Sequence, residues 1–113
     1  LKNGAEISSV PTEIGALTGL DRLVLNGVEL PSVPTEVGAL TGLTQLDLGF
    51  NRLLTSVPTE VGALTGLTQL DLGFNRLLTS VPTEVGALTA LVELDLFDNA
   101  ITSLPTEIGT LRS

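Results

Sequence analysis

Residues 32–64 read SVPTEVGALTGLTQLDLGFNRLLTSVPTEVGAL, and residues 56–88 repeat the same 33 residues after an offset of 24. Weaker copies of this unit lie on both sides of the identical pair. A fixed period of about 20–30 residues is typical of stacked-repeat proteins, in which each copy forms one layer of a continuous solenoid. The repetition therefore predicts the fold. It says much less about function, because identical copies carry little partner-specific information.

The composition agrees with a single repeat domain. The chain has 113 residues, and 42% of them are hydrophobic, mostly Leu and Val. A core made from so few side-chain types suits an environment that recurs from layer to layer. No stretch approaches the ~18 consecutive apolar residues of a transmembrane helix.

The charge argues against two classes of partner. The chain carries 13 acidic and 5 basic residues, for a net charge of −8. Binding to nucleic acids and to anionic membranes rests on Lys and Arg, so we expect neither partner. The sequence has no Cys, no N-x-S/T acceptor and no apolar start like that of a signal peptide, which favours a cytoplasmic location. It begins with Leu1 rather than Met, as expected for a fragment or for a designed or shortened array.

The repeats align on their leucines. Four units open with the pattern LxxLxxLxL, which begins at Leu17, Leu40, Leu64 and Leu88. This alignment predicts one solenoid domain over residues 1–113, with a partial repeat (1–16), four repeats (17–39, 40–63, 64–87 and 88–110) and a stub (111–113). Three residues after the last leucine of the pattern, the first repeat has Val28 and the other three have Asn51, Asn75 and Asn99.

These motifs resemble those of the leucine-rich repeat family along almost the whole chain. The ending LPxxIGxL is similar to 23-residue Ras-suppressor-type repeats, and NRLLTSVPTEVG is similar to the 24-residue plant-type repeat. The resemblance implies an α/β repeat solenoid, a segment of a curved horseshoe. Its concave face would be a parallel β-sheet, and its convex face would carry short 3₁₀ or α turns.

The residues support this architecture. In Leu46-Asp47-Leu48 the alternation of apolar and polar side chains predicts a short half-buried strand. The Asn that follows each strand can satisfy backbone groups of the turn, so Asn51, Asn75 and Asn99 are predicted to form a buried structural ladder.

The second half of each repeat predicts a helical turn. Its Pro suits the first position of such a turn, and a Glu two residues later lies near the positive end. The glycines of this half are expected to adopt a left-handed or a tightly packed conformation: Gly15, Gly38, Gly62, Gly86 and Gly109.

Stacking places equivalent surface residues about 4.8 Å apart in columns. The candidate binding residues are those predicted to line the concave face: Gln45, Asp47, Phe50, Arg52, Gln69, Asp71, Phe74, Arg76, Glu93, Asp95 and Phe97.

Two alternatives remain open for this face. The stacked carboxylates, which should raise one another's pKa, either meet a basic peptide or a cation, or are solvated and partly neutralised by Arg52 and Arg76. The phenylalanines either anchor a partner or cover the edge of the core.

Catalysis has little support in the sequence. The chain has no His and no Cys, which removes the most common general base and the thiol nucleophile. It has no Gly-rich phosphate loop, and one carboxylate per repeat makes a poor cage for a hard cation. We therefore predict no enzymatic activity, no catalytic residues, no cofactor and no metal.

Two functions from different classes fit the sequence. The first is a protein–protein interaction or scaffold module that binds a protein or peptide through its concave face, as the family resemblance implies. The second is a self-associating solenoid, because stacked repeats need polar caps and neither end of this chain shows one. Such a chain would form dimers or head-to-tail assemblies.

Overall fold

The computed structural model describes residues 12–102, 104 and 105. Most of the predicted partial repeat (1–11), the end of the last repeat (106–110) and the stub (111–113) lie outside the described residues, as does Gly109. The described chain alternates short 3₁₀ helices with short strands, which confirms the predicted repeat solenoid.

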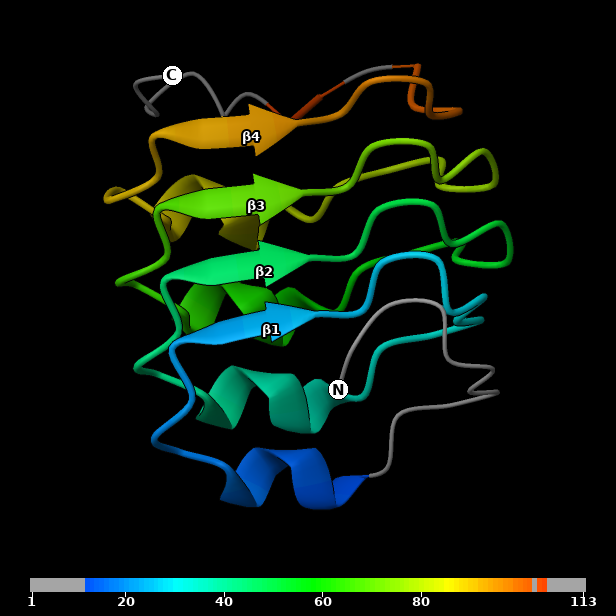
Figure 1. The fold of residues 1–113 in the computed structure, drawn as a ribbon. Coiled ribbons are helices and arrows are strands. Elements are labelled where there is room, and N and C mark those ends of the chain that lie inside the picture. Colours follow the sequence, from blue (N-terminus) through cyan, green and yellow to red (C-terminus); the bar gives the residue numbers. More distant parts are fainter. Residues whose placement is uncertain (1–11, 103, 106–113) are drawn as a thin grey trace.

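Each layer contributes one strand to a single sheet. The four strands are β1 (Arg22–Val24), β2 (Gln45–Asp47), β3 (Gln69–Asp71) and β4 (Glu93–Asp95). They pair in parallel in the order β1-β2-β3-β4, so neighbours in sequence are also neighbours in space (Figure 1). We call each strand with the loop that follows it a rung, and number the rungs 1 to 4 from β1.

The helices form a second column behind the sheet. They are η1 (Thr12–Ala16), η2 (Thr35–Ala39), η3 (Thr59–Ala63) and η4 (Thr83–Ala87), and each precedes the strand of its own layer (Figure 1). Pro34, Pro58 and Pro82 are the N-cap residues of η2 to η4, with extended backbone angles such as φ −68° and ψ 147° at Pro34. The prediction that Pro occupies the first helical position was wrong by one residue, because its extended ψ places it just outside the helix.

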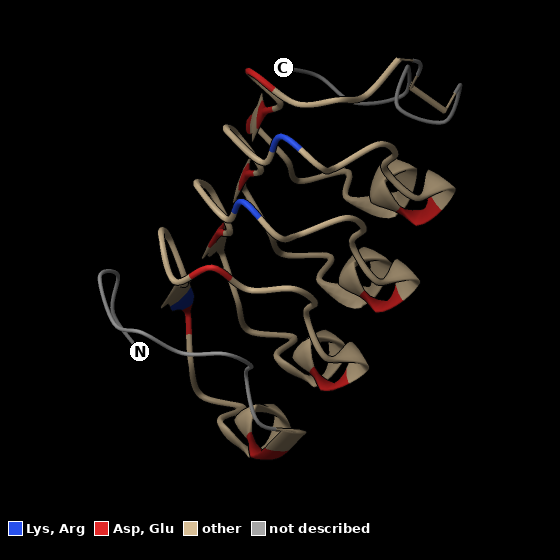
Figure 2. Cartoon of the chain, turned by 90° about the vertical axis from the view of Figure 1, so that its right-hand side faces the viewer, with Lys and Arg blue, Asp and Glu red and all other residues tan. Residues whose placement is uncertain are grey.

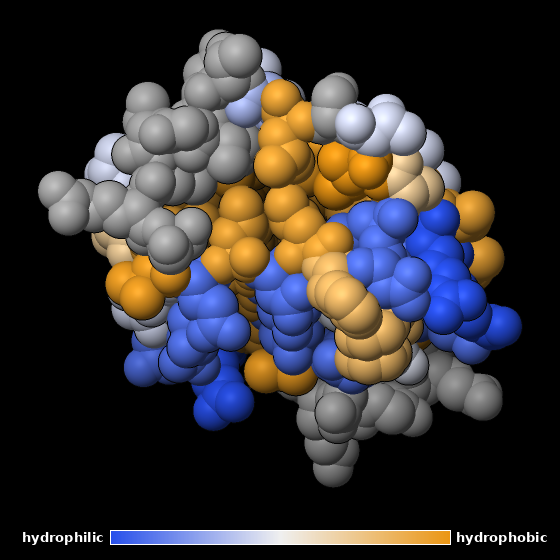
Figure 3. All heavy atoms as spheres, turned by 90° about the horizontal axis from the view of Figure 1, so that it is seen from above, coloured by the Kyte–Doolittle hydropathy of each residue, from blue (hydrophilic) through white to orange (hydrophobic). Residues whose placement is uncertain are grey.

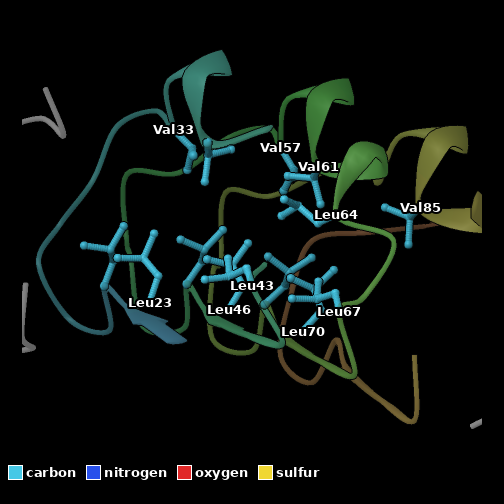
Figure 4. Close-up of a cluster of buried hydrophobic side chains, with 14 of the residues drawn as sticks. Leu23, Val33, Leu43, Leu46, Val57, Val61, Leu64, Leu67, Leu70 and Val85 are labelled. Carbon is cyan, nitrogen blue, oxygen red and sulfur yellow. The ribbon is translucent and has the colours of Figure 1, made fainter. Parts of the chain in front are cut away.

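The core fills the space between these two columns. Leucines of the strands point back toward valines of the helices and of the segments that lead into them (Figure 4). Leu46, Leu70, Val61 and Val85 are each at most 1% exposed. Burying such a side chain contributes about 1.5–3 kcal/mol. Each layer buries the same apolar set against the next, so the core continues along the stack.

The asparagines form a second continuous feature of the interior. Asn51 and Asn75 are fully buried, and their side-chain amides donate to the carbonyl oxygens of Leu48 (2.7 Å) and Leu72 (2.8 Å) respectively. The backbone N–H of Asn51 donates to the side-chain oxygen of Asn75 at 2.8 Å, and that of Asn75 donates to Asn99 at 3.1 Å. The three residues therefore link rungs 2, 3 and 4 through buried hydrogen bonds.

Of the two conformations considered for the helix glycines, left-handed and tightly packed, the structure supports the second. Gly15, Gly38 and Gly62 lie inside 3₁₀ helices, and the only glycine with a positive φ among the described residues is Gly27. The left-handed alternative was therefore wrong for these three and for Gly86, which lies inside η4 (Thr83–Ala87), and the tightly packed one holds for Gly15, Gly38 and Gly62. A Cβ on Gly62 would lie 2.7 Å from the Cβ of Glu84 and 2.8 Å from its carbonyl oxygen. Glycine thus allows adjacent helices to approach closely.

Replacing Gly62 with Ala should destabilise the stack. The added methyl group meets backbone of η4, which cannot move without disturbing the next layer, so we expect a loss of about 1–3 kcal/mol in the free energy of unfolding. Urea denaturation followed by circular dichroism measures it. Gly66→Ala is the matched control, because a Cβ there has only the Leu43 oxygen nearby, at 3.9 Å, and Ala90 occupies the equivalent position. Equal stability of the two variants would contradict helix packing as the reason for glycine.

Candidate functional site

The outward side chains of the strands line an open groove along the sheet. The strand register places Arg22, Gln45, Gln69 and Glu93 in one column and Val24, Asp47, Asp71 and Asp95 in a second. Six of the predicted binding residues therefore come together here. Figure 3, which looks down the stack, shows hydrophilic and hydrophobic residues gathered in separate ridges on the surface.

The aspartates of the second column hold the turn that follows each strand. The Oδ1 atoms of Asp47 and Asp71 accept hydrogen bonds at 2.9 Å from the backbone N–H groups of Gly49 and Gly73, two residues further on. Asp95 accepts in the same way from Phe97 at 3.0 Å. This local arrangement is the usual way in which an Asp side chain stabilises a turn. The column therefore has a structural role whether or not it binds a partner.

Asp71 is the aspartate at the centre of the column. Its pKa is raised, first by partial burial and then by the negative charges of Asp47, Asp95 and Glu93, while the hydrogen bond from Gly73 acts in the opposite direction. The expected repulsion between stacked carboxylates is therefore present at Asp71.

The arginines do not neutralise this column. Arg52 pairs with Glu29 at 2.7 Å, and Arg76 pairs with Asp98 at 3.0 Å, in the loops that follow the strands. The alternative in which Arg52 and Arg76 offset the charge of the aspartates was wrong, because each arginine has an acidic partner in a neighbouring rung. Both arginine side chains remain 74% exposed, so solvent screens these pairs and they contribute little stability.

The phenylalanines form a ladder in the loops that follow the carboxyl ends of strands β2, β3 and β4. The rings of Phe50 and Phe74 stack with centroids 4.4 Å apart and planes inclined by 11°. Phe97 meets Phe74 edge-on, with centroids 5.4 Å apart. Phe50 and Phe97 are 50% and 68% exposed, so the rings do more than cover the core. We call these three residues the Phe ladder.

The structure thus divides the predicted binding face into two parts. The strand groove contains Gln45, Asp47, Gln69, Asp71, Glu93 and Asp95. The adjacent loop edge contains Phe50, Arg52, Phe74, Arg76 and Phe97. Figure 2 shows acidic residues and the two arginines along this side, and further acidic residues on the helices at the opposite side.

Sequence reasoning did not predict the contacts of three residues that shape this edge. Glu29 and Asp98 hold the two arginines, and the Asn26 amide lies 3.4 Å from both carboxylate oxygens of Asp47. All three occur where rungs 1 and 4 depart from the two identical central repeats. Such departures are the signal that could have found them.

The chemistry of this arrangement is that of recognition. It offers carboxylate acceptors in the groove and aromatic surface at the edge. Over residues 12–102, 104 and 105, no three His, Cys, Asp or Glu side chains gather closely enough to hold a metal ion. The same residues include no helix with the length and apolar character needed to cross a bilayer.

Comparison with known proteins establishes the family. Residues 41–101, more than half of the chain, match the leucine rich repeat family model. The chain therefore belongs to the leucine-rich repeat family. Proteins of this family are often interaction modules and generally lack catalytic activity. A search of the curated protein sequences finds no match.

Solved structures of the family share the fold. A leucine-rich repeat protein of Leptospira interrogans is 34% identical, with a TM-score of 0.76, and the match covers 96% of this chain and 33% of that one. The complex of BIR3 and SERK2 from Arabidopsis thaliana contains a chain that is 31% identical, with a TM-score of 0.77 and coverage of 88% and 55%.

A third structure contains a peptide. It is the Arabidopsis receptor kinase HAESA in complex with the peptide hormone IDA and the co-receptor SERK1, 29% identical, with a TM-score of 0.78 and coverage of 95% of this chain and 21% of that one. The chain thus spans about a third of the Leptospira protein, about half of the matched chain in the BIR3–SERK2 complex and about a fifth of this third one.

Asp71→Asn should stabilise the protein at neutral pH. The raised pKa in the folded state means that ionised Asp71 opposes folding, and Asn keeps an oxygen that can accept from Gly73. We expect a gain of about 0.2–1 kcal/mol, the range for cross-strand pairs. The gain should shrink as the pH falls through the folded-state pKa of Asp71, because the folded parent then takes up the proton that relieves the repulsion.

Urea denaturation of parent and variant between neutral and acidic pH measures this gain. Glu60→Gln, on η3 at the opposite face, controls for the loss of one negative charge. A gain that does not change with pH, or a loss of stability at neutral pH, would contradict repulsion in the column.

Proposed function

We propose that this chain is a non-catalytic module that binds a protein or peptide with positive charge through the strand groove and the loop edge beside it. The observation that carries the proposal is the partly exposed column of Asp47, Asp71 and Asp95 on three neighbouring parallel strands. The central carboxylate of this column, Asp71, has a raised pKa, first because of its partial burial and then because of the negative charges of Asp47, Asp95 and Glu93. A cationic partner would relieve this repulsion, so its binding would gain from a charge arrangement that costs the free protein stability.

The hydrogen bonding of the aspartates supports the same function. The turn N–H groups occupy Oδ1 of Asp71 and Asp95, and within the described part of the chain Oδ2 of each has no protein donor. Each aspartate can therefore keep its turn and accept from a ligand at the same time. Relatives offer a parallel: HAESA is in complex with a peptide hormone and a co-receptor, and BIR3 is in complex with SERK2.

Changing the column to asparagine should weaken binding of a basic peptide. The triple variant Asp47→Asn, Asp71→Asn, Asp95→Asn keeps the side-chain oxygens that hold the turns and removes three charges. The probe is a hexa-arginine peptide with one tryptophan, followed by its fluorescence, since the protein has no Trp and no Tyr. We expect affinity to fall at least tenfold at low salt, and less at high salt, where charges are screened.

The matched control removes three charges from the opposite face. Glu36→Gln, Glu60→Gln and Glu84→Gln together also remove three negative charges, but these residues lie on helices η2, η3 and η4. If both triple variants lose the same affinity, the peptide responds to net charge alone and the groove is not its site. Unchanged affinity in the aspartate variant would remove the acidic column from the proposal.

A second candidate function is self-association through the ends of the stack. Leu94 and Leu96 in rung 4 are only partly buried, whereas their equivalents Leu70 and Leu72 in rung 3 are at most 1% exposed. Stacking of a second copy on this end would complete their burial.

Light scattering behind size-exclusion chromatography, over a dilution series, tests this second function. An end-to-end assembly predicts a mass that rises with concentration above the 11.7 kDa of one chain. Leu94→Lys places a charge at the exposed end and should reduce that rise, while Glu36→Gln on helix η2 changes the net charge by the same one unit and should not. A constant monomer mass at all concentrations would exclude this function.

A further inference from the structure

The Phe ladder has one open end. One face of the Phe50 ring is covered by Phe74, so the opposite face is turned toward rung 1. The backbone N–H groups of Gly27 and Phe50 donate to Gly49 and Gly73 in the same pattern, which makes Gly27 the equivalent of Phe50 in rung 1. Gly27 has no side chain, and among the residues that the structure describes a Cβ there would meet no atom within 4 Å. Within that part of the chain, a space one rung deep therefore remains beside Phe50.

Two residues of the Phe ladder have a backbone conformation that is unfavourable for phenylalanine. Phe50 and Phe74 have φ of 59° and 60°, in the left-handed region that bulky residues rarely adopt. The equivalent position in rung 4 holds Asp98, and in rung 1 both Gly27 and Glu29 have a positive φ. Gly and Asp are residue types that this region accepts more readily. Residues kept in such conformations cluster at binding and catalytic sites. The stacked rings therefore point to a ligand that uses them.

The surroundings of the open end favour a cation. Asp47 holds the turn that leads directly into Phe50, and its carboxylate also lies beside Asn26, the neighbour of Gly27. The charge of Arg52 is already matched by Glu29. Farther along the groove, Asp71 lies in rung 3 and Glu93 and Asp95 lie in rung 4, while Arg22 lines the groove in rung 1. An uncovered aromatic face beside carboxylates is an arrangement that attracts a planar cation.

We propose that this space binds an arginine side chain of the partner, with its guanidinium stacked on the free face of Phe50 in the place left by Gly27. The proposal rests on the proposed function and adds to it the identity of one recognised residue. Arginine fits better than lysine because its planar, weakly hydrated group stacks on rings while its N–H groups can reach a carboxylate. The rest of the basic peptide would lie over the aspartate column.

The test compares arginine with lysine at constant charge. Tryptophan-labelled hexa-arginine and hexa-lysine peptides are titrated against the parent protein and against Gly27→Phe. Phe50 and Phe74 show that this backbone conformation accepts phenylalanine, so the new ring should continue the ladder and fill the space. We expect the preference for arginine over lysine to fall about three- to tenfold in Gly27→Phe.

Two further variants keep the result interpretable. Phe50→Leu removes the ring without adding bulk, and should reduce the arginine preference even if Gly27→Phe fails to fold. Leu53→Ala changes another half-exposed apolar residue, two positions after Asn51, and should leave the preference unchanged. Thermal unfolding shows that each variant is folded.

The outcomes separate this inference from the proposed function. A preference for arginine that survives both Gly27→Phe and Phe50→Leu would overturn the stacking site. Equal binding of the two peptides to the parent protein would also overturn it, while leaving a charge-driven groove in place. If neither peptide binds the parent, both the inference and the cationic partner fail.

Discussion

The rest of the structure depends on the buried asparagine ladder. At Asn51 the side-chain amide donates to the carbonyl oxygens of Leu25 and Leu48 at 3.1 and 2.7 Å, and the side-chain oxygen accepts from the N–H of Leu30 at 3.1 Å. Each such backbone group, if buried without a partner, would cost about 1–3 kcal/mol. No buried side-chain nitrogen or oxygen among the described residues lacks a partner. The leucine core favours burial in any layer, but the ladder fixes where each loop turns.

The same turn also builds the candidate site. Within five residues, Asp47 turns outward and holds the N–H of Gly49, Phe50 takes the left-handed conformation, and Asn51 turns inward. A single local conformation therefore directs a carboxylate to the groove, a ring to the edge and an amide to the core. Rung 3 repeats these residues. The groove and the Phe ladder therefore both follow from the turn that the asparagine ladder supports.

Much of the fold could be predicted from the sequence because the repeat fixes it at every layer. The period predicted the stack, the leucine spacing predicted the strands, and the resemblance supplied the 3₁₀ helices. The failures have local causes. For Gly62 the sequence left a left-handed and a tightly packed conformation open, and the nearby backbone of η4 decides for the packed one through a contact that spans two layers. Phe50 has the left-handed conformation in this repeat, and a phenylalanine in the sequence does not predict a positive φ.

The candidate site was predictable only in part for a related reason. Columns followed from the period, so the residues of the groove could be named in advance. The partners of Arg52 and Arg76 could not, because Glu29 and Asp98 belong to the irregular outer rungs. In rung 1 the strand-to-ladder spacing also changes: Val28 takes the ladder position, and the Asn51 oxygen accepts instead from Leu30. Alignment to the central repeat cannot place side chains in such a segment.

The irregular ends give direction to an otherwise repetitive surface. Two identical rungs alone would offer a partner two equivalent registers, 24 residues apart. Rung 4 ends the Phe ladder with the edge-on ring of Phe97, and rung 1 leaves it open at Gly27. The ladder therefore has two chemically different ends, although its middle is uniform. A partner that contacts an end as well as the column would bind in a single register and a single orientation, which identical repeats could not impose.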